Sequence, residues 1–473
     1  MFKIMSGWIV VACFLTGVAA AQPPVTLTIS TQFRGKPIPS GFIGWSFETG
    51  SLHYNHYKPH AYFFDSTNAQ LLTLFRNIGI RTLRLGGNSV DRGYVPSRRA
   101  INALFRFVKA SGVKVIYSLR LANDNPQQDA LTARYLWTHY RKYIVCLAIG
   151  NEPNSYNGLD RQITGFPSFI AKWNTFASAI VAAVPDVELG GPDNGNGSTF
   201  WSTSFARDEK GNRNLAEILC HYEPGGPSRG KTPRQLINEM LSSACDNRWY
   251  PTCYRRVGLM AQSLGFAYRF SEANSQVATP ASRGGNHSFA TALFALDFMH
   301  WWAEHDCRGV NFHTGLGGWN GEFFLNSNGS YQPYPIAYGV AAFNVGGHGV
   351  ADSVVITNPD HLNLTAYAVS ARHRHMFITI INKEHGRHAR AALVRMNTVG
   401  THVSVMYLMA PHNDVADTAG ITLGGAAISS AHLWHGQWKL LDFSNKPGVT
   451  VEVPASSAAI VRFTGVKIDA RRD

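Results

Sequence analysis

Two glutamates follow apolar runs of the kind that form buried strands. Glu152 comes shortly after the run Tyr143–Ile149, and Glu272 comes shortly after Gly265–Phe270. Polar residues directly after an apolar strand are not needed for packing, so they indicate chemistry. Two facing carboxylates can hydrolyse a glycosidic bond, because a separation of about 5 Å lets one attack the sugar and a wider gap admits water. Helix capping or ion pairing is the alternative for either glutamate taken alone.

The two glutamates are expected to have different catalytic roles. We predict that Glu272 is the nucleophile and that Glu152 is the general acid and then the general base. Asn151 can donate a hydrogen bond to the sugar 2-hydroxyl, and Pro153 fixes the chain after Glu152. The reaction needs no cofactor. The cysteines and histidines show no zinc-type spacing, so we predict no structural metal.

The segments that would position both glutamates alternate between strand and helix from residue 41 to 345. About eight repeats of this alternation predict a (β/α)8 TIM barrel, whose reactive groups lie at the carboxyl ends of the strands. Glu152 and Glu272 would then face each other from the fourth and seventh strands. The expected strands are Phe42–Phe47, Arg81–Leu85, Val113–Leu119, Tyr143–Ile149, Asp186–Leu189, Ala216–His221, Gly265–Phe270 and Gly309–Phe312, and the clearest helices are Asn68–Asn77, Ile101–Ser111, Phe166–Val184 and Phe289–Glu304.

The pattern changes after Phe343. Residues Asn344–Gly349 have the composition of a linker, and short alternating runs separated by turn residues follow. This spacing predicts a C-terminal β-sandwich domain over residues 346–473. Residues 22–40 contain the alternating run Val25–Ser30, which we expect to add a strand to the sandwich. The other expected strands are Leu364–Val369, Met376–Ile381, Ala391–Val394, Val403–Leu408 and Ala458–Phe463.

The first 21 residues have the pattern of a secretory signal. Lys3 precedes the apolar run Trp8–Val18, and Ala19-Ala-Ala21 ends it, so we expect cleavage after Ala21 and a secreted protein. An uncleaved anchor is the alternative. No later segment is long and apolar enough to cross a membrane, so we expect no membrane association once the signal is removed.

The charge balance is basic, with 43 Lys and Arg against 30 Asp and Glu and a net charge of +13. A basic surface favours acidic polysaccharides by long-range attraction, although it also fits a purely solubilising role. Nucleic acid is disfavoured because no basic stripe is interleaved with aromatic residues. The sequence does not indicate an oligomeric state.

The cysteines divide into two groups. Cys146, Cys220 and Cys307 lie in or beside apolar runs, where a buried thiol behaves as a small hydrophobic group. Cys245 and Cys253 lie close together in a loop-like stretch, where they could form a disulfide outside the cytoplasm.

Several segments together resemble glycoside hydrolase family 79, which holds β-glucuronidases and heparanase. The acid/base and nucleophile segments of that family resemble Ile149-Gly-Asn-Glu-Pro-Asn154 and Phe270-Ser-Glu-Ala-Asn-Ser275. The resemblance covers most of the chain in the right order, and it implies a barrel with a β-sandwich completed by N-terminal residues. The further matching segments are Gly44-Trp-Ser-Phe-Glu48, Arg84-Leu-Gly-Gly-Asn-Ser89, Phe289–Asp297, Asn311-Phe-His313 and Pro335–Phe343.

The resemblance also implies supporting residues around the two glutamates. Arg84 would hydrogen-bond Glu272 and keep it ionised, with a purely structural ion pair as the alternative. Tyr222, at the end of the sixth strand, would contact the nucleophile. Glu48 and Asn88 would bind sugar hydroxyls or cap a helix. Trp319 would offer an aromatic platform to the sugar or aglycone.

The segment after Glu272 departs from the family pattern. Family glucuronidases hold the uronate carboxylate with a tyrosine and a Gly-Gly pair, but Val277 stands at the tyrosine position here. Gly284 and Gly285 come later and follow Arg283, which can bind a carboxylate through two parallel hydrogen bonds. Equally, the altered segment could accept a neutral sugar.

The sequence therefore favours a secreted, retaining exo-β-glycosidase that acts on a carbohydrate substrate. Within that class the resemblance favours a β-glucuronidase. Three alternatives stay open: a β-glucosidase or diglycosidase acting on plant glycosides, an endo-acting enzyme similar to heparanase, and a carbohydrate-binding relative without activity.

Overall fold

The computed structural model describes residues 23–53, 62–196, 198–277, 279, 283–315, 321, 323–326, 329–397, 400–441 and 448–466. The predicted signal over residues 1–21 lies outside the described residues. Among the described helices, none combines the length and the apolar character needed to span a membrane.

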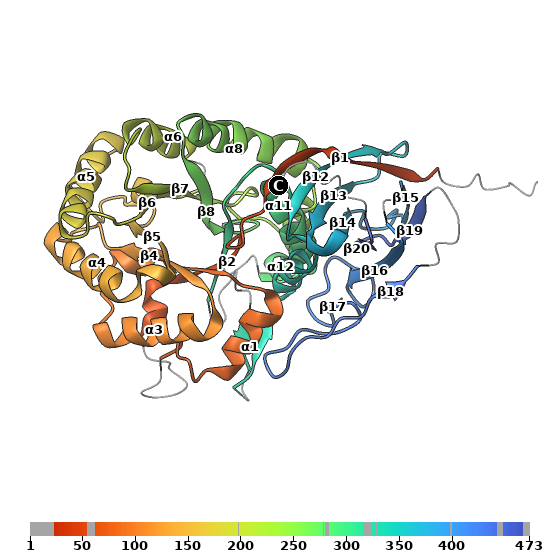
Figure 1. Cartoon of the computed structure of the whole chain (residues 1–473), viewed down its shortest axis with the longest axis horizontal. Coiled ribbons are helices and arrows are strands. Elements are labelled where there is room, and N and C mark those ends of the chain that lie inside the picture. The colour runs from red at the N-terminus through yellow and green to blue at the C-terminus, as the bar shows by residue number, and fades with distance from the viewer. Residues whose placement is uncertain are drawn as a thin grey trace, which may run out of the picture.

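Residues 43 to 346 form a closed barrel of eight parallel strands surrounded by helices, which confirms the predicted (β/α)8 fold (Figure 1). Almost every strand residue is buried, because helices cover the outside and side chains fill the inside. The strands are β2 (Ile43–Glu48), β3 (Thr82–Gly86), β4 (Lys114–Leu119), β5 (Ile144–Ile149), β6 (Leu189–Asn194), β7 (Leu215–Tyr222), β8 (Ala267–Ala273) and β9 (Val310–Thr314).

The barrel helices begin and end where their local sequence allows it. Asn68 and Ser97 accept hydrogen bonds from backbone amides of the first turns of α1 and α3, and Gly79 and Gly112 end these helices in left-handed conformations. The helices are α1 (Ala69–Ile78), α2 (Asn88–Asp91), α3 (Arg98–Ser111), α4 (Pro126–Tyr140), α5 (Phe166–Ala183), α6 (Thr199–Asp208), α7 (Pro233–Met240), α8 (Tyr250–Arg256), α9 (Gly258–Ser263), α10 (Arg283–Asn286), α11 (Ala290–Glu304) and α12 (Pro335–Gly346).

The fifth barrel strand differs from its prediction. We expected it over Asp186–Leu189, but β6 begins at Leu189 and ends at Asn194. Its sequence is Leu-Gly-Gly-Pro-Asp-Asn, and glycine and proline are depleted in strands. Packing explains the glycines: a Cβ on Gly190 would lie 2.8 Å from the Cys146 sulfur, and one on Gly191 would lie 2.8 Å from the Phe205 ring.

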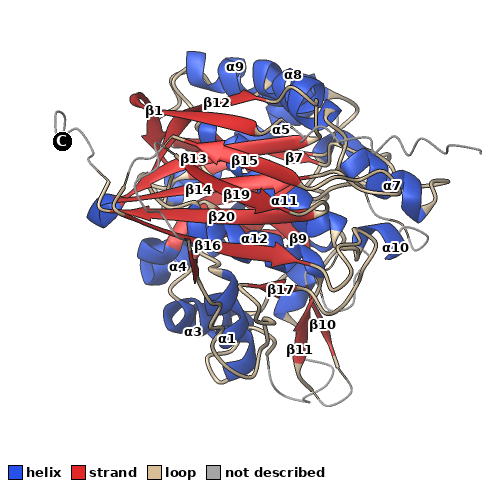
Figure 2. Cartoon of the chain, turned by 90° about the vertical axis from the view of Figure 1, so that its right-hand side faces the viewer, coloured by secondary structure: helices blue, strands red, loops and turns tan. Residues whose placement is uncertain are grey.

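The C-terminal part forms one ten-stranded sheet that curls around a second hydrophobic core (Figures 1 and 2). The N-terminal strand β1 (Val25–Pro37) runs antiparallel to β12 and parallel to β15 within this sheet. Its other strands are β12 (Val350–Thr357), β13 (Leu364–Ala371), β14 (His375–Asn382), β15 (Ala392–Met396), β16 (His402–Met409), β17 (Thr422–Leu423), β18 (Lys439–Leu440), β19 (Val449–Val453) and β20 (Ser457–Thr464).

The barrel and the sheet share a buried interface. Helices α11 and α12 lie between them, and α12 contacts β14, β16 and β20 (Figure 1). Helix α12 continues to Gly346, so the segment expected as a linker from Asn344 begins as helix. Lys383, just after β14, pairs with Asp297 of α11 at 2.8 Å and with Asp246 at 2.5 Å. Charged groups as well as apolar side chains therefore join the two parts.

The suggested disulfide between Cys245 and Cys253 is wrong. The five cysteines among the described residues are all free and buried. Cys245 begins a π-helical turn (Cys245–Trp249) that continues directly into α8, which contains Cys253. Eight helical residues separate two Cα atoms by about 12 Å along the helix axis, and a disulfide requires less than about 7 Å. Burial of Cys146, Cys220 and Cys307 agrees with the prediction.

Candidate active site

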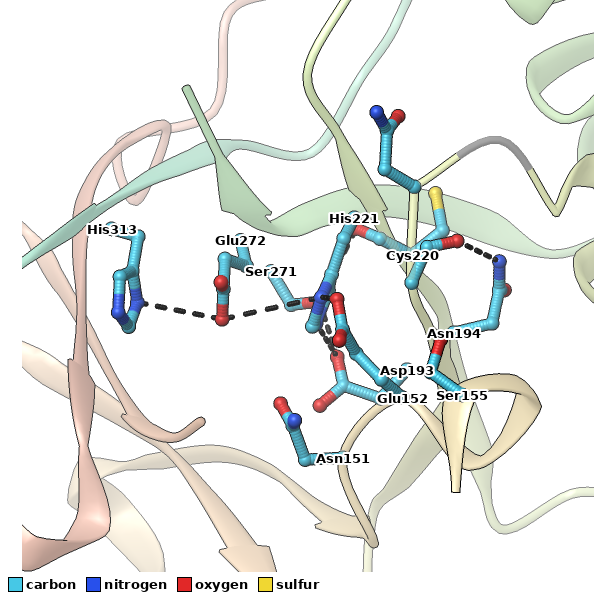
Figure 3. A network of polar contacts seen from close by, with 12 residues as sticks. Asn151, Glu152, Ser155, Asp193, Asn194, Cys220, His221, Ser271, Glu272 and His313 are labelled. Carbon is cyan, nitrogen blue, oxygen red and sulfur yellow. Dashed lines mark hydrogen bonds and ion pairs between the residues drawn. The ribbon is translucent and has the colours of Figure 1, made fainter. Parts of the chain in front are cut away.

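Glu152 and Glu272 meet at the carboxyl ends of the barrel strands (Figure 3). Glu272 belongs to β8, while Glu152 follows β5 in a left-handed conformation with φ of 47°. The Glu152 amide donates to the carbonyl of Asp193 at 2.9 Å, which fixes this turn. One oxygen of each glutamate and one ring nitrogen of His221 all lie within 4.8 Å of one another. The two carboxylates predicted to work together are therefore brought face to face.

A fully buried arginine organises the carboxylates. Arg84, from β3, donates to Glu272 Oε2 at 2.6 Å through Nη1. Its Nη2 donates to Asp193 Oδ2 at 2.5 Å and to Asn151 Oδ1 at 2.6 Å. Nη1 also lies 3.1 Å from the Ser46 hydroxyl. The contact predicted between Arg84 and Glu272 is present, and the same guanidinium neutralises a second buried carboxylate.

Asn151 is oriented by this arginine. Its Oδ1 accepts from Arg84, and its backbone amide donates to Asp91 Oδ2 at 2.8 Å. Because the oxygen is occupied, Nδ2 is the group left to donate, and no partner for it is found among the described residues. The side chain therefore presents a donor beside Glu152, as the prediction of a sugar-binding role requires.

His221 stands between the two glutamates (Figure 3). Its Nδ1 lies 2.9 Å from Glu152 Oε1 and 4.0 Å from Glu272 Oε2, and its Nε2 lies 3.3 Å from Asp193 Oδ1. Burial alone would lower the pKa of His221, but the charges of Glu272 and Asp193 outweigh it and raise the pKa to about 10. The imidazole is thus protonated at neutral pH and bridges the carboxylates.

Glu272 is held in its ionised form. Its burial would raise the pKa, but the positive charges of His313, His221 and Arg84 lower it to about 2. His313, from β9, places Nδ1 3.4 Å from Glu272 Oε2. Arg84 and His221 also hold the pKa of Asp193 well below its usual range against its burial. A carboxylate that stays ionised and is 15% exposed is suited to attack a bound group.

Tyr222 does not take the place predicted for it beside the nucleophile. Its ring packs among Tyr250, Phe270, Phe298 and Trp302, between the barrel and the surrounding helices. The neighbouring His221 reaches the site instead. Strand β7 has an irregular register against β8 between Cys220 and His221, and such an irregularity changes which side chain points inward.

Glu48 shows the capping arrangement that was the alternative to sugar binding. The Glu48 oxygens accept from the backbone amides of Asn88 at 3.1 Å and Ser89 at 2.7 Å, at the start of α2. Gly87 allows this close approach, since a Cβ there would lie 2.5 Å from the Glu48 carboxyl carbon. Asn88 is exposed, and its side chain makes no hydrogen bond found among the described residues.

The two glycines of the expected carboxylate clamp lie in a short helix that packs on α7. Gly284 and Gly285 belong to α10, where added Cβ atoms would lie 3.0 Å from Pro233 and 2.8 Å from Leu236 of α7. These glycines thus pack on a neighbouring helix, and no contact of theirs with Glu152 or Glu272 is found within the described part of the chain. The Arg283 side chain and Trp319 lie outside the described residues.

Four site residues were not assigned a role from the sequence, namely Asp193, His221, His313 and Glu223. Glu223 follows β7 by one residue and is 8% exposed. Asn196 holds its backbone through both Oδ1 and Nδ2, at 3.1 and 2.9 Å. Burial and the charges of Glu272 and Glu152 raise the pKa of Glu223, although His221 opposes them. The sequence signal was its position directly after a barrel strand, where polar residues indicate chemistry.

The cluster of Glu152, His221 and Glu272 is compact enough to enclose a cation. However, the space between the carboxylates is already occupied by a protonated imidazole, and Glu272 Oε2 is bound by Arg84. The positive charges of Arg84 and His221 already compensate the two carboxylates, which disfavours a divalent ion. The arrangement suits proton transfer and nucleophilic attack better than metal binding.

The fold is similar to those of several solved glycoside hydrolases. No family model and no curated protein sequence matches the chain. A 4-O-α-L-rhamnosyl-β-D-glucuronidase from Fusarium oxysporum 12S has a similar structure, with a TM-score of 0.73 at 16% identity over 92% of this chain and 99% of that chain. A family 51 arabinofuranosidase from Xanthomonas axonopodis pv. citri gives a TM-score of 0.68 at 13% identity, over 93% of this chain and 99% of that one. An α-L-arabinofuranosidase from Thermotoga maritima gives 0.68 at 12%, with the same coverages.

Proposed function

We propose that this chain is a retaining β-glycosidase with Glu272 as nucleophile and Glu152 as acid/base. The observation that carries the proposal is the short separation of the two carboxylates, which have one oxygen each within 4.8 Å. Retaining enzymes have carboxyl groups about 5–5.5 Å apart, whereas inverting enzymes need about 6.5–9.5 Å to admit a water molecule. The β-configuration rests on the resemblance to family 79.

In the first step, Glu272 attacks the anomeric carbon and the bond to the leaving group breaks. Oε1 of Glu152 accepts from His221, which leaves Oε2 to carry the proton that passes to the glycosidic oxygen. Asn151 Nδ2 donates to the 2-hydroxyl, a hydrogen bond that strengthens in the transition state. Arg84, His221 and His313 keep Glu272 ionised before it attacks.

In the second step, water displaces Glu272 from the sugar. Formation of the glycosyl ester removes the negative charge of Glu272, so Glu152 no longer faces an ionised partner and can accept the proton of the water. The oxygen of that water becomes the anomeric hydroxyl on the original face. Glu152 regains its proton and Glu272 leaves as a carboxylate, so the enzyme returns to its starting state.

We propose a β-glucuronide as the substrate and an exported, exo-acting enzyme. The resemblance to family 79 supports this choice, and so does the structural likeness to an enzyme described as a rhamnosyl-glucuronidase. A neutral β-glucoside is the second candidate. It is favoured by Val277, which is 41% exposed at the position where family glucuronidases carry a tyrosine and which offers no hydrogen bond to a carboxylate.

The test compares kcat/KM for an aryl β-glucuronide and the matching aryl β-glucoside, with Glu272→Ala as the blank. NMR of the first-formed sugar reports whether the anomeric configuration is kept. A preference for the glucuronide with retention supports the full proposal. A preference for the glucoside with retention moves the substrate to the second candidate and leaves the mechanism standing. Inversion, or no turnover by the parent, contradicts the mechanism.

A further inference from the structure

Three loops at the carboxyl end of the barrel converge on one carboxylate that the proposed reaction steps do not use. Asp91 is the last residue of α2, which follows β3, and it is 2% exposed. Its Oδ1 accepts from the backbone amides of Leu121 at 3.1 Å and Ala122 at 3.0 Å, which follow β4. Its Oδ2 accepts from the Asn151 amide and the Tyr156 hydroxyl, both at 2.8 Å, and these residues follow β5. One side chain thus joins the loops after three consecutive strands.

The turn that carries Glu152 depends on such contacts. Gly150 and Glu152 have left-handed φ values of 86° and 47°, and a non-glycine residue is strained in that region unless its surroundings hold it there. The Gly150 amide donates to the Leu119 carbonyl at 2.8 Å. The Glu152 amide donates to the Asp193 carbonyl at 2.9 Å. The amide between these two donates to Asp91, so the middle of the turn is held by a side chain.

The groups bound by Asp91 also pack against this turn. A Cβ on Gly150 would lie 2.9 Å from the Tyr156 hydroxyl oxygen and 3.0 Å from the Leu121 Cβ. Tyr156 is 6% exposed and Leu121 is completely buried, so neither can move aside into solvent. Asp91 therefore fixes the turn directly, through the hydrogen bond to its middle amide, and indirectly, through two of its packing neighbours.

An ion pair does not explain the burial of Asp91. No salt bridge to its carboxylate is found among the described residues. Burial raises the pKa of Asp91, and the hydrogen bonds from the three amides and the tyrosine hydroxyl oppose that rise. Burying a carboxylate without a cation costs free energy, even when hydrogen bonds surround it. A group kept at such a cost beside a reacting carboxyl points to a functional role.

We propose that Asp91 is a positioning residue for the acid/base, and that by binding the Asn151 amide it holds the Glu152 carboxyl within reach of the oxygen of the departing group. The proposal rests on the proposed glycosidase activity. Asp91 is buried and its two oxygens are bound by four donors, so it acts through the turn and touches no substrate. A displaced acid transfers its proton less well, because general acid catalysis requires hydrogen-bond reach between the acid and the oxygen that it protonates.

Asp91→Asn changes this hydrogen bonding while keeping the size of the side chain. The new Nδ2 is a donor, and it is best placed beside Tyr156, whose hydroxyl can accept as well as donate. There it leaves the Asn151 amide without an acceptor. Tyr156→Phe is the milder variant, because it removes one of the four donors to Asp91 and leaves the carboxylate in place.

The test compares two aryl β-glycosides of the terminal sugar that the parent prefers. Dinitrophenol departs without a proton, whereas phenol needs the proton of Glu152. The measured quantity is kcat/KM for the phenyl glycoside divided by kcat/KM for the 2,4-dinitrophenyl glycoside. We expect Asp91→Asn to lower this ratio about tenfold, a part of the roughly 10²–10⁴-fold that general acid catalysis contributes. Tyr156→Phe should lower the ratio by a smaller factor.

Asp129→Asn is the matched control. Asp129 is a carboxyl of α4 that is 5% exposed, and its Oδ2 has no hydrogen-bond partner among the described residues. The same substitution at a similarly buried position therefore leaves the turn untouched, and its ratio should equal that of the parent.

The ratio separates positioning from a purely structural role. If Asp91→Asn lowers kcat/KM equally for both glycosides, the ratio stays that of the parent and the proposal is overturned, while the glycosidase proposal stands. If Asp91→Asn does not fold, the ratio in Tyr156→Phe decides between the same two outcomes. A parent that hydrolyses neither glycoside contradicts the proposed activity itself.

Discussion

Arg84 Nη1 lies 2.6 Å from Glu272 Oε2, and the arginine side chain is completely buried while that of the glutamate is 15% exposed. The same guanidinium binds Asp193 at 2.5 Å, so one positive charge is shared by two carboxylates. Their charges raise the pKa of Arg84 despite its burial, and the arginine cannot lose its proton. The nucleophile candidate is thus tied to a group of constant charge.

The first prediction concerns Arg84→Met. Removal of the cation raises the pKa of Glu272, so the acid limb of the kcat/KM profile moves to higher pH. We expect kcat/KM at neutral pH to fall on the order of 10²-fold. Buried Asp193 loses its partner, and breaking such a pair costs about 3–5 kcal/mol of unfolding free energy. The measurements are pH–rate profiles and urea unfolding, with exposed Arg99→Met as the control.

Two outcomes would contradict this reading of Arg84. The first is an acid limb that stays at the pH of the parent while activity falls, which would leave Arg84 with a purely structural role. The second is a variant as stable as the parent, which would show that Asp193 does not depend on the guanidinium.

The second prediction concerns the pH dependence of stability through His221. The folded-state pKa of about 10 lies above the unfolded value of about 6.5. A raised histidine pKa contributes stability that is fully present below about pH 6.5 and is lost as the pH rises through about 10. His221→Gln should therefore be less stable than the parent at pH 6, and the difference should shrink towards pH 10.

Urea unfolding at pH 6, 8 and 10 measures this difference. His388→Gln is the control, since His388 is exposed and makes no contact with the two glutamates among the described residues. A difference between parent and His221→Gln that stays constant with pH would show that the charges of Glu272 and Asp193 do not hold the proton on the imidazole.

The third prediction concerns Glu223, a buried carboxyl beside the catalytic pair. Its raised pKa means that the folded state holds the proton more tightly than the unfolded state does. The folded state therefore loses stability as the pH rises above about 4.3, the pKa of a glutamate in the unfolded chain. Glu223→Gln removes this loss, and we therefore expect it to raise the unfolding free energy at pH 7.

The increase in unfolding free energy caused by Glu223→Gln should disappear near pH 4. An increase caused by better packing would persist at that pH. Thermal unfolding at pH 4, 5.5 and 7 provides the measurement. Glu384→Gln is the comparison, because Glu384 lies in the sheet domain and its carboxylate already accepts from the Asn363 amide at 2.9 Å. Equal effects of Glu223→Gln at all three pH values would contradict the prediction.

The overall fold and the position of the two glutamates could be predicted from the sequence because they depend on local patterns. Apolar runs followed by polar residues mark the ends of β5 and β8, and the helices between them have clear periodicity. The sequence did not indicate a role for Asp193, because the residues around it are not typical of a strand. Its strand reads Leu-Gly-Gly-Pro-Asp-Asn, where glycines serve close packing against Cys146 and Phe205 rather than a turn.

The choice between His221 and Tyr222 depends on long-range structure. The register of β7 against β8 shifts between Cys220 and His221, and this shift decides which of two adjacent side chains faces Glu272. Gly284 and Gly285 were expected to belong to a carboxylate-binding loop, but they lie in α10, which packs on α7. In both cases the position of a side chain is decided by contacts with elements that are distant in the sequence, so the local sequence could not predict it.

The last prediction concerns the joint between the barrel and the sheet. Lys383 is buried and bonds Asp297 of the barrel at 2.8 Å and Asp246 at 2.5 Å, while Thr365 and Tyr367 of β13 donate to Asp297 at 2.6 and 2.8 Å. Lys383→Met leaves two buried carboxyls without their cation, so we expect the unfolding free energy to fall by about 3–5 kcal/mol.

Among the described residues, Lys383, Asp297 and Asp246 make no contact with Glu152 or Glu272. Below the unfolding transition of Lys383→Met, we therefore expect the kcat/KM of this variant to equal that of the parent. Calorimetry and activity assays on one preparation test both statements, with exposed Lys439→Met as the control. Two separate unfolding transitions in the variant would show that Lys383 couples the barrel to the sheet. An unchanged unfolding temperature would show that apolar packing of α11 and α12 alone holds the two parts together.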